Sequence, residues 1–110
     1  MTNQEYFDTV TRHLLNQNEQ SIGDGGLCSY RGTDGLKCAI GCLIPDDKYD
    51  PGLEGRGVLH PAVYSLIGAQ PDQTSLLLGL QSTHDGRVPS EWRERLWEIA
   101  MVFDLKFNGL

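Results

Sequence analysis

The sequence predicts an α+β domain that is mainly helical and carries one small β-hairpin in its N-terminal half. Apolar residues recur at helical spacing near both ends of the chain, which is typical of amphipathic helices. Between these regions, a Gly-Thr-Asp-Gly segment at 32–35 separates two short runs, as a hairpin turn does. With 110 residues, 39% of them hydrophobic, the chain has the size and composition of a single domain over residues 1–110.

The first predicted helix covers residues 3–17. Thr2 or Asn3 can cap its start, and Glu5 lies in the first turn, where the helix dipole favours a carboxylate. The apolar face of this helix consists of Phe7, Val10 and Leu14. Such a face predicts that the helix packs against the core along its whole length.

The predicted hairpin, over residues 27–38, has two possible registers. A two-residue turn places Arg31 opposite Cys38, and Cys28 then points to the other face. A three-residue loop places Tyr30 opposite Cys38, and Cys28 then shares their face. Because a slip of one residue moves every side chain across the sheet, the sequence leaves both registers open.

Three more helices are predicted in the C-terminal half, over residues 60–67, 72–86 and 90–105. Asp72 and Ser90 have side chains suited to cap the last two. The apolar positions of these helices recur with the helical period, so we expect them to complete one core with the first helix.

The composition disfavours two classes of function. A formal net charge of -6 argues against a broad interface with the nucleic-acid backbone, which requires clustered Lys and Arg. No apolar stretch approaches the length of a membrane-spanning helix, and residues 1–10 lack the basic and apolar regions of a secretory signal. We therefore expect a cytoplasmic protein that binds neither nucleic acid nor membrane and keeps its three cysteines as thiols.

The cysteines are spaced as Cys28-x9-Cys38-x3-Cys42, whereas zinc ribbons and fingers show Cys-x2-Cys pairs. On a helix, Cys38 and Cys42 would share one face. Together with Cys28, one histidine (His60 or His84) would complete a Cys3His set, which is the alternative interpretation. Cysteine is also among the most buried residue types, so we expect the thiols to pack in the core, with no metal and no cofactor.

A second alternative is a small Cys-His hydrolase. If the apolar run 38–44 is a short helix rather than a strand, Cys38 lies at its N-terminus, where the pKa of a thiol falls. His84 would then serve as the base and Asp85 as the group that orients it. Because the triplet His84-Asp85-Gly86 also makes an ordinary helix end, our main prediction assigns no catalytic residue.

Several cations lie beside glycines and an aromatic residue, a pattern typical of an anion-binding or nucleotide-binding site. The candidate ligand-binding residues are Tyr30, Arg31, Lys37 and Arg56. Neither of the common phosphate-binding loop motifs is present. The alternative is that the cations of the hairpin pair with nearby carboxylates: Asp34, Asp46 or Asp47.

An acidic segment over residues 46–54 is the candidate partner-binding site. Its carboxylates are Asp46, Asp47, Asp50 and Glu54. They could present negative charge to a basic protein, much as a phosphate backbone does. The spacing is not that of an EF-hand, which disfavours calcium, and a solvated loop is the plain alternative.

Several motifs place the chain beside a known group of sequences. The first is Tyr30-Arg31-Gly32-x-Asp34-Gly35-x-Lys37-Cys38-Ala39-Ile40-Gly41, followed by Leu43-Ile44-Pro45-Asp46 and Glu54-Gly55. The later ones are Leu77-x-x-Leu80-Gln81-x-x-His84-Asp85 and Trp92-x-x-x-Leu96-x-x-Ile99-Ala100. Over most of the chain from residue 28 on, the sequence resembles small uncharacterised proteins of phages and prophage-bearing bacteria. The resemblance implies a phage origin and the cytoplasm of a bacterial host, and it transfers no catalytic residue.

Together with the resemblance, these patterns predict a non-enzymatic binding protein. By analogy with other short acidic phage proteins, it would inhibit a host anti-phage defence component, as anti-CRISPR proteins do. It would act by occupying a host protein or by sequestering a nucleotide-like small molecule. A further alternative is a structural or interaction protein that forms a homodimer, because the last helix is expected to expose Trp97 and Met101.

Overall fold

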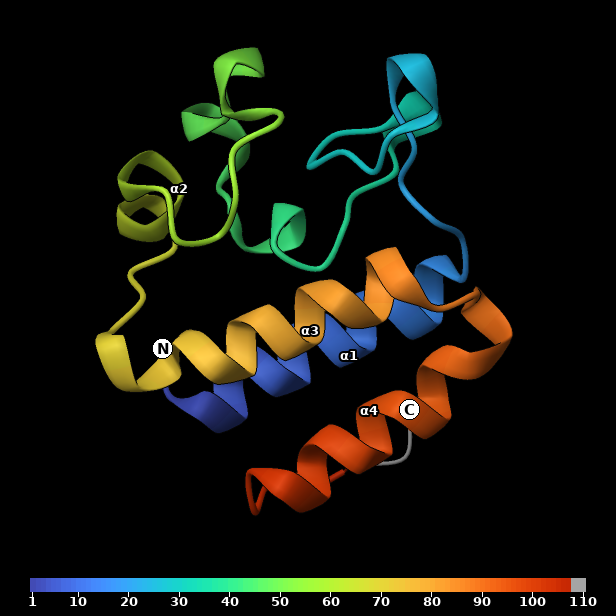
Figure 1. Ribbon diagram of the computed structural model, residues 1–110, viewed down its shortest axis with the longest axis vertical. Coiled ribbons are helices and arrows are strands. Elements are labelled where there is room, and N and C mark those ends of the chain that lie inside the picture. The colour runs from blue at the N-terminus through green and yellow to red at the C-terminus, as the bar shows by residue number, and fades with distance from the viewer. Residues whose placement is uncertain (108–110) are drawn as a thin grey trace.

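The computed structural model describes residues 1–107, and its α-helices in that range are α1 (Asn3–Gln17), α2 (Pro61–Leu66), α3 (Thr74–Gly86) and α4 (Pro89–Val102). The three long helices α1, α3 and α4 pack against one another. Figure 1 shows the irregular segment between α1 and α2 lying across one side of α1 and α3. The long helices therefore form a base on which residues 18–60 rest.

The prediction of the first helix is confirmed, because α1 covers residues 3–17. Its start is a capping box, in which the Thr2 hydroxyl accepts a hydrogen bond from Glu5 N and the Glu5 carboxylate accepts one from Thr2 N. The buried face consists of Tyr6, Phe7, Val10, Thr11 and Leu14. This face points into the core that α1 shares with α3 and α4.

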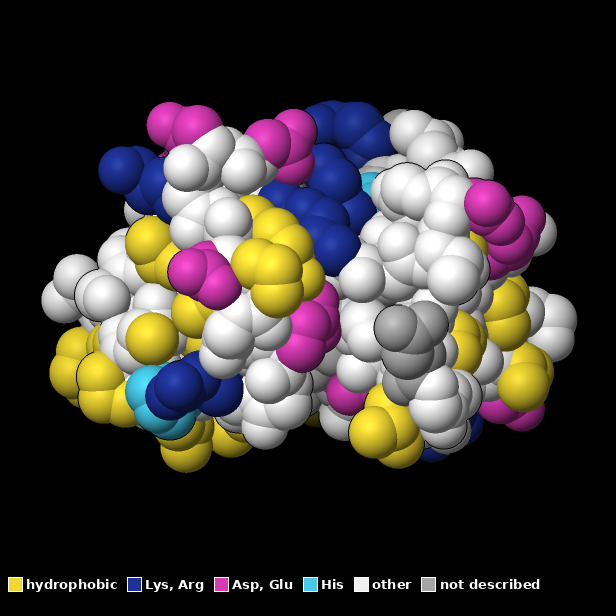
Figure 2. Space-filling model, turned by 90° about the horizontal axis from the view of Figure 1, so that it is seen from above, with side chains coloured by type: hydrophobic (Ala, Val, Ile, Leu, Met, Phe, Trp, Pro, Cys, Tyr) yellow, Lys and Arg dark blue, Asp and Glu magenta, His cyan; other side chains and the backbone are white. Residues whose placement is uncertain are grey.

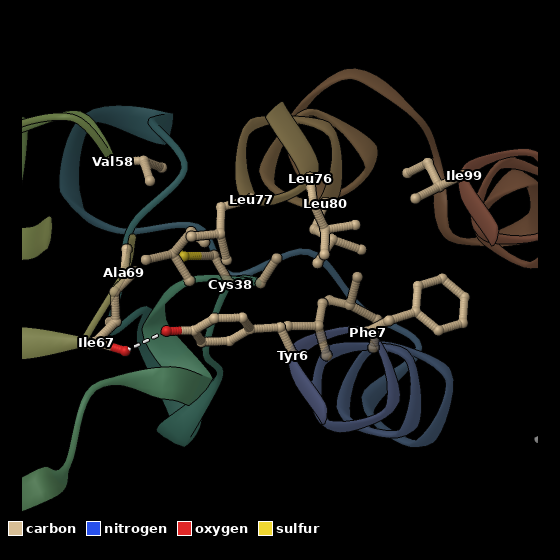
Figure 3. Packing of buried hydrophobic residues seen from close by; sticks show 14 of the residues in the cluster. Tyr6, Phe7, Cys38, Val58, Ile67, Ala69, Leu76, Leu77, Leu80 and Ile99 are labelled. Carbon is tan, nitrogen blue, oxygen red and sulfur yellow. Dashed lines mark hydrogen bonds between the residues drawn. The ribbon is translucent and has the colours of Figure 1, made fainter. Parts of the chain in front are cut away.

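The core lies between the three long helices and extends under the irregular segment. Figure 3 shows Tyr6 and Phe7 of α1 facing Leu76 and Leu80 of α3, with Cys38 beside them. The Tyr6 hydroxyl donates to the carbonyl of Ile67 at 2.6 Å, so this buried phenol is satisfied. The largest side chain that is fully buried is Trp92 of α4.

The three helices of the C-terminal half exist, but their bounds differ from those predicted: α2 covers 61–66 instead of 60–67, α3 begins at Thr74, and α4 begins at Pro89 and ends at Val102 instead of residue 105. Asp72 lies in a 3-10 turn, Pro71–Gln73, that leads directly into α3 without a side-chain cap from Asp72. Ser90 lies inside α4, which begins at Pro89. Proline is common at the first helical position because its missing N–H would be unpaired there in any case.

The predicted β-hairpin is wrong, and with it the α+β class, because residues 1–107 contain no strand and the fold is all-helical. Where the hairpin was expected, Thr33–Gly35 form a 3-10 turn. A single antiparallel pair joins Arg31 and Lys37 across this turn and does not extend into a ladder. That pairing corresponds to the register with a three-residue loop.

The ladder does not extend because other groups bond to Tyr30 and Cys38, which would form its next hydrogen-bonded pair. The carboxylate of Glu54 accepts hydrogen bonds from the backbone N–H groups of Tyr30 (2.9 Å) and Arg31 (3.0 Å). On the opposite side, the carbonyl of Cys38 accepts a hydrogen bond from Cys42 N at 3.1 Å. The amide of Gln17 bonds to the outward-facing N–H (3.0 Å) and carbonyl (2.8 Å) of Lys37 and so fixes this segment against α1. Glu54 and Gln17 lie about twenty residues away along the chain, so a local pattern does not reveal them.

Two similar loops follow each other, nine residues apart. The first closes with the pair Ile22 and Cys28, and the second with the pair Arg31 and Lys37. In each loop a glycine N–H donates to a leucine carbonyl at 2.8 Å: Gly23 to Leu27 and Gly32 to Leu36. The buried Ser21 hydroxyl can donate to a carbonyl from each side, those of Ser29 and Leu36, and so joins the loops.

The helices of residues 1–107 include none that is both long enough and apolar enough to cross a membrane.

Candidate functional site

Arg31 is the centre of the motif at residues 30–46. Its guanidinium donates to the carbonyls of Gly41 (2.6 Å) and Ile44 (2.9 Å) and to the carboxylate of Asp46 (2.9 Å). It also lies over the ring of Tyr49, with 4.8 Å between the guanidinium carbon and the ring centroid. These contacts engage both terminal nitrogens of the guanidinium, Nη1 and Nη2, and they connect three parts of the irregular segment through Arg31.

Lys37 reaches the same carboxylate. Its ammonium lies 3.2 Å from Asp46 Oδ1, so Asp46 pairs with Lys37 and Arg31 together. Hydrogen bonding to the two cations lowers the pKa of the Asp46 carboxyl below its ordinary value. The sequence alternative in which the hairpin cations pair with a nearby carboxylate is the one that the structure shows, and the carboxylate is Asp46.

Tyr30 and Arg56, the other two candidate ligand-binding residues, point elsewhere. Tyr30 is buried, and its hydroxyl donates to the carbonyl of Arg56. The Arg56 guanidinium donates to the carbonyl of Gly52 at 2.8 Å and meets the ring of His60. The four candidates therefore contact one another's backbone but do not direct their charges into one anion cradle.

The candidate partner-binding carboxylates have three different environments. Glu54 is structural, because it accepts hydrogen bonds from two backbone N–H groups and from the hydroxyl of Tyr49 (2.6 Å). Asp46 pairs with the two cations described above. Asp47 and Asp50 are exposed, and Asp50 also accepts a hydrogen bond from Gly52 N at 2.7 Å.

A small cavity opens between the first loop, the turn at 54–58 and the last turns of α3. It measures about 140 Å³, and its walls include Cys28, Tyr30, Cys38, Glu54, Val58, Gln81 and Asp85. Both cysteines of the predicted hairpin thus reach one cavity, although no sheet brings them there. His84 lies behind this wall, fully buried.

The hydrogen bonds of His84 fix its protonation. Ser21 N donates to His84 Nε2 at 2.8 Å, so Nε2 must carry a lone pair. The single ring proton is therefore on Nδ1, from which it is donated to Asp85 Oδ1 at 2.7 Å. The ring also stacks on Trp92, with 5.6 Å between centroids. His84 joins the loop at residue 21 to α3 and α4.

One group of side chains has the outward form of a metal site. The sulfur of Cys28, a nitrogen of His84 and an oxygen of Asp85 lie within 4.8 Å of one another. A metal at His84 Nδ1 would have to displace the only proton of a ring whose other nitrogen accepts a hydrogen bond. The donor set therefore fits a hydrogen-bonded chain and not a metal centre.

The remaining members of the Cys3His alternative have other partners. The Cys42 thiol donates to the carbonyl of Ala39 at 3.0 Å. His60 caps α2, where its Nδ1 accepts a hydrogen bond from Ala62 N at 3.1 Å. Neither side chain belongs to the group formed by Cys28, His84 and Asp85.

The thiols of the cavity are held in the neutral form. Burial raises the pKa of Cys38 to about 12, even though Gly41 N donates to its sulfur at 3.2 Å. Partial burial, and then the neighbouring charge of Asp85, raise the pKa of Cys28 to about 11. Because His84 offers its lone pair to Ser21, it has none to accept a proton from Cys38. These contacts do not favour the Cys-His hydrolase, which stays a prediction.

We expect alkylation to report this neutral state directly. At pH 8, iodoacetamide should label Cys28 roughly 100-fold more slowly than free cysteine, because a thiol with a pKa about 11 is almost entirely protonated. Asp85→Asn should accelerate the labelling of Cys28, since it removes the adjacent negative charge. Mass spectrometry of the labelled peptide gives the rate. Labelling of Cys38 faster than free cysteine would contradict this description and support the hydrolase.

Several residues of the site were not among the sequence candidates. Gln81 donates to Asp85 at 2.9 Å and accepts from Ile40 N at 3.0 Å, and so connects α3 to the motif. Gln17 does the same for α1 at Lys37. A glutamine on a helix surface carries no local signal of such a role. The two similar loops do leave a signal in the sequence, the nine-residue spacing of Gly23 and Gly32.

Comparison of the chain with protein-family models, with curated proteins and with solved structures finds no match.

Proposed function

We propose that this chain is a non-enzymatic binding protein that forms a complex with a basic protein partner through the acidic segment at 46–54. One observation carries the proposal. Arg31 and Lys37 form ion pairs with Asp46. The carboxylates of Asp47 and Asp50, in contrast, are exposed on the same segment. A surface of this kind attracts a positively charged partner, and the net charge of -6 adds to the attraction at longer range.

The shape of the acidic segment supports the proposal. Two 3-10 turns, Asp46–Lys48 and Pro51–Leu53, define its course. The side chains of Ile44 and Leu53 are buried and anchor it to the core. Figure 2 looks down on the irregular segment and shows acidic side chains around a central group of Lys and Arg. Because this surface is already ordered, a partner need not pay the entropy of ordering it.

The contacts favour a protein partner over a nucleotide-like ligand. A nucleotide would require cations that point into one cradle, whereas Arg31 and Lys37 already share Asp46 and Arg56 contacts His60. A phage origin and a target in host defence stay predictions, since they rest on the resemblance. Formation of a homodimer also stays a prediction, although Trp97 and Met101 are exposed on α4, 52% and 64% respectively.

The test is affinity capture with charge-matched variants. The tagged chain should retain a basic protein through gel filtration, and raising the salt concentration should weaken the complex. The double variant Asp47→Asn, Asp50→Asn should lose the partner, while its amide oxygens can still accept the bond from Gly52. The matched control is Glu94→Gln, Glu98→Gln, which removes the same charge from exposed sites on α4. Equal capture by the two double variants would refute the assigned surface.

A further inference from the structure

The cavity beside α3 has a ligand chemistry of its own, separate from the acidic segment. Its volume of about 140 Å³ is several times the roughly 10–15 Å³ of probe-occupied space that one water molecule requires. A small organic group therefore fits, provided that its charge and polarity match the walls. The walls come from four separate parts of the chain: residues 28–30, Cys38, residues 54–58 and the end of α3.

Two carboxylates line the cavity, those of Asp85 and Glu54, and both oxygens of Glu54 already accept hydrogen bonds from the protein. His84 Nδ1 donates to Asp85 Oδ1 at 2.7 Å, and Gln81 Nε2 donates to the same oxygen at 2.9 Å. Although burial opposes ionisation, these hydrogen bonds lower the pKa of Asp85 below its ordinary value. The carboxylate is therefore both ionised and fixed in orientation. Both bonds are made to Oδ1, and the Cys28 thiol is a further, neutral hydrogen-bond neighbour of the carboxylate.

The other walls leave this negative charge without a cation. Arg56 is the basic residue of the wall, and its guanidinium is directed to Gly52 and His60. Glu54 accepts three hydrogen bonds, from Tyr30 N, Arg31 N and the Tyr49 hydroxyl, and is a second carboxylate of the wall rather than a cation. The two cysteines are neutral thiols, and Tyr30 and Val58 contribute apolar surface.

We propose that this cavity binds an organic cation, an ammonium or guanidinium group, with Asp85 as its counter-charge. The apolar part of the ligand lies against Tyr30, Val58 and the thiols of Cys28 and Cys38. A charged hydrogen-bond donor suits a carboxylate that is held ionised, and the π face of tyrosine also attracts cations. A metal ion is disfavoured because His84 has no lone pair left for it.

Two sources can supply the cation, a free amine or a basic side chain of another protein, and the chemistry of recognition is the same. This inference goes beyond the proposed complex, since Asp85 would bind a cation whether or not Asp47 and Asp50 contact a partner. Two probes separate the sources. Propylammonium is a free amine, and Nα-acetyl-lysine-N-methylamide carries an ammonium on a peptide backbone.

The experiment is a titration followed by amide resonances in two-dimensional NMR spectra, at constant ionic strength. Propylammonium should shift the amides of Gly55, Gly57 and Val58 in a saturable manner, whereas neutral 1-propanol should not. Asp85→Asn should weaken binding at least about tenfold, since a charged hydrogen bond is lost. Glu98→Gln, which removes the same charge from α4, should leave the affinity unchanged.

A second variant keeps the test informative if Asp85→Asn disturbs the fold. Cys28→Leu leaves Asp85 in place and narrows the cavity, so it should also abolish the shifts. The lysine derivative binding as tightly as propylammonium would indicate a protein side chain, and binding of propylammonium alone would indicate a free amine. Shifts that are equal for 1-propanol, or undiminished in Asp85→Asn, would overturn the proposal.

Discussion

Replacing His84 with alanine is expected to lower the free energy of unfolding by about 4 kcal/mol, as urea denaturation will measure. The side chain is fully buried, so its loss leaves a cavity against Trp92. The same change leaves the buried N–H of Ser21 without its acceptor at 2.8 Å, and an unsatisfied buried donor is itself expensive. The size of the effect follows from the sum of these two losses.

A second substitution at the same position separates the two losses. His84→Phe keeps a ring that can stack on Trp92 but offers no acceptor to Ser21, so we expect a loss of about 2 kcal/mol. Ser82→Ala, an exposed change on the same helix, is the control and should alter stability by less than about 0.5 kcal/mol. An unchanged free energy of unfolding in His84→Ala would contradict the structural role of the ring. It would then favour the alternative in which His84 is a catalytic base.

The helices were predictable because their signal is local. In α1 the apolar residues recur within the helix itself, and the capping box needs only Thr2 and Glu5. The long helices bury one face each, so the period of the sequence is enough to define them. The exact starts of α3 and α4 were missed, since Pro71 and Pro89 begin these regions before the residues that were expected to cap them.

The hairpin was not predictable from its own residues. Its turn signal is real, and the loop at 33–35 does bring Arg31 opposite Lys37. Whether such a pair grows into a ladder depends on what else can bond to the neighbouring backbone. Here Glu54, about twenty residues away, accepts from Tyr30 N, and Cys42 N donates to the carbonyl of Cys38. A non-local competitor of this kind outweighs the local preference for a strand.

In the candidate site, as in the fold, neighbouring residues reveal some features, and others depend on how distant parts of the chain pack. Pairing of the hairpin cations with a carboxylate was one of the alternatives that the sequence left open, because the charges lie close together along the chain. That Cys28, Cys38 and Asp85 line one cavity depends on how α3 packs against the motif, which no local pattern contains. The glycines of the motif could be noted in the sequence, but what each one approaches is a property of the fold.

Gly41→Ala is expected to destabilise the protein by about 3 kcal/mol or more. A Cβ atom at this position would lie 2.3 Å from the carbonyl oxygen of Tyr30 and 3.0 Å from its Cα. The obstacle is backbone, and it cannot move aside, because Tyr30 N is bound to Glu54 and the Gly41 carbonyl to Arg31. Chemical denaturation measures the loss.

Gly57→Ala is the matched control, since no atom lies within 4 Å of the Cβ that it would add. It should be neutral or slightly stabilising, because alanine restricts the unfolded chain more than glycine does. Equal stability of the two variants would mean that the motif tolerates a side chain here. The expected difference would assign Gly41 to the packing of the motif on Tyr30, which explains why glycine is needed there without invoking a ligand.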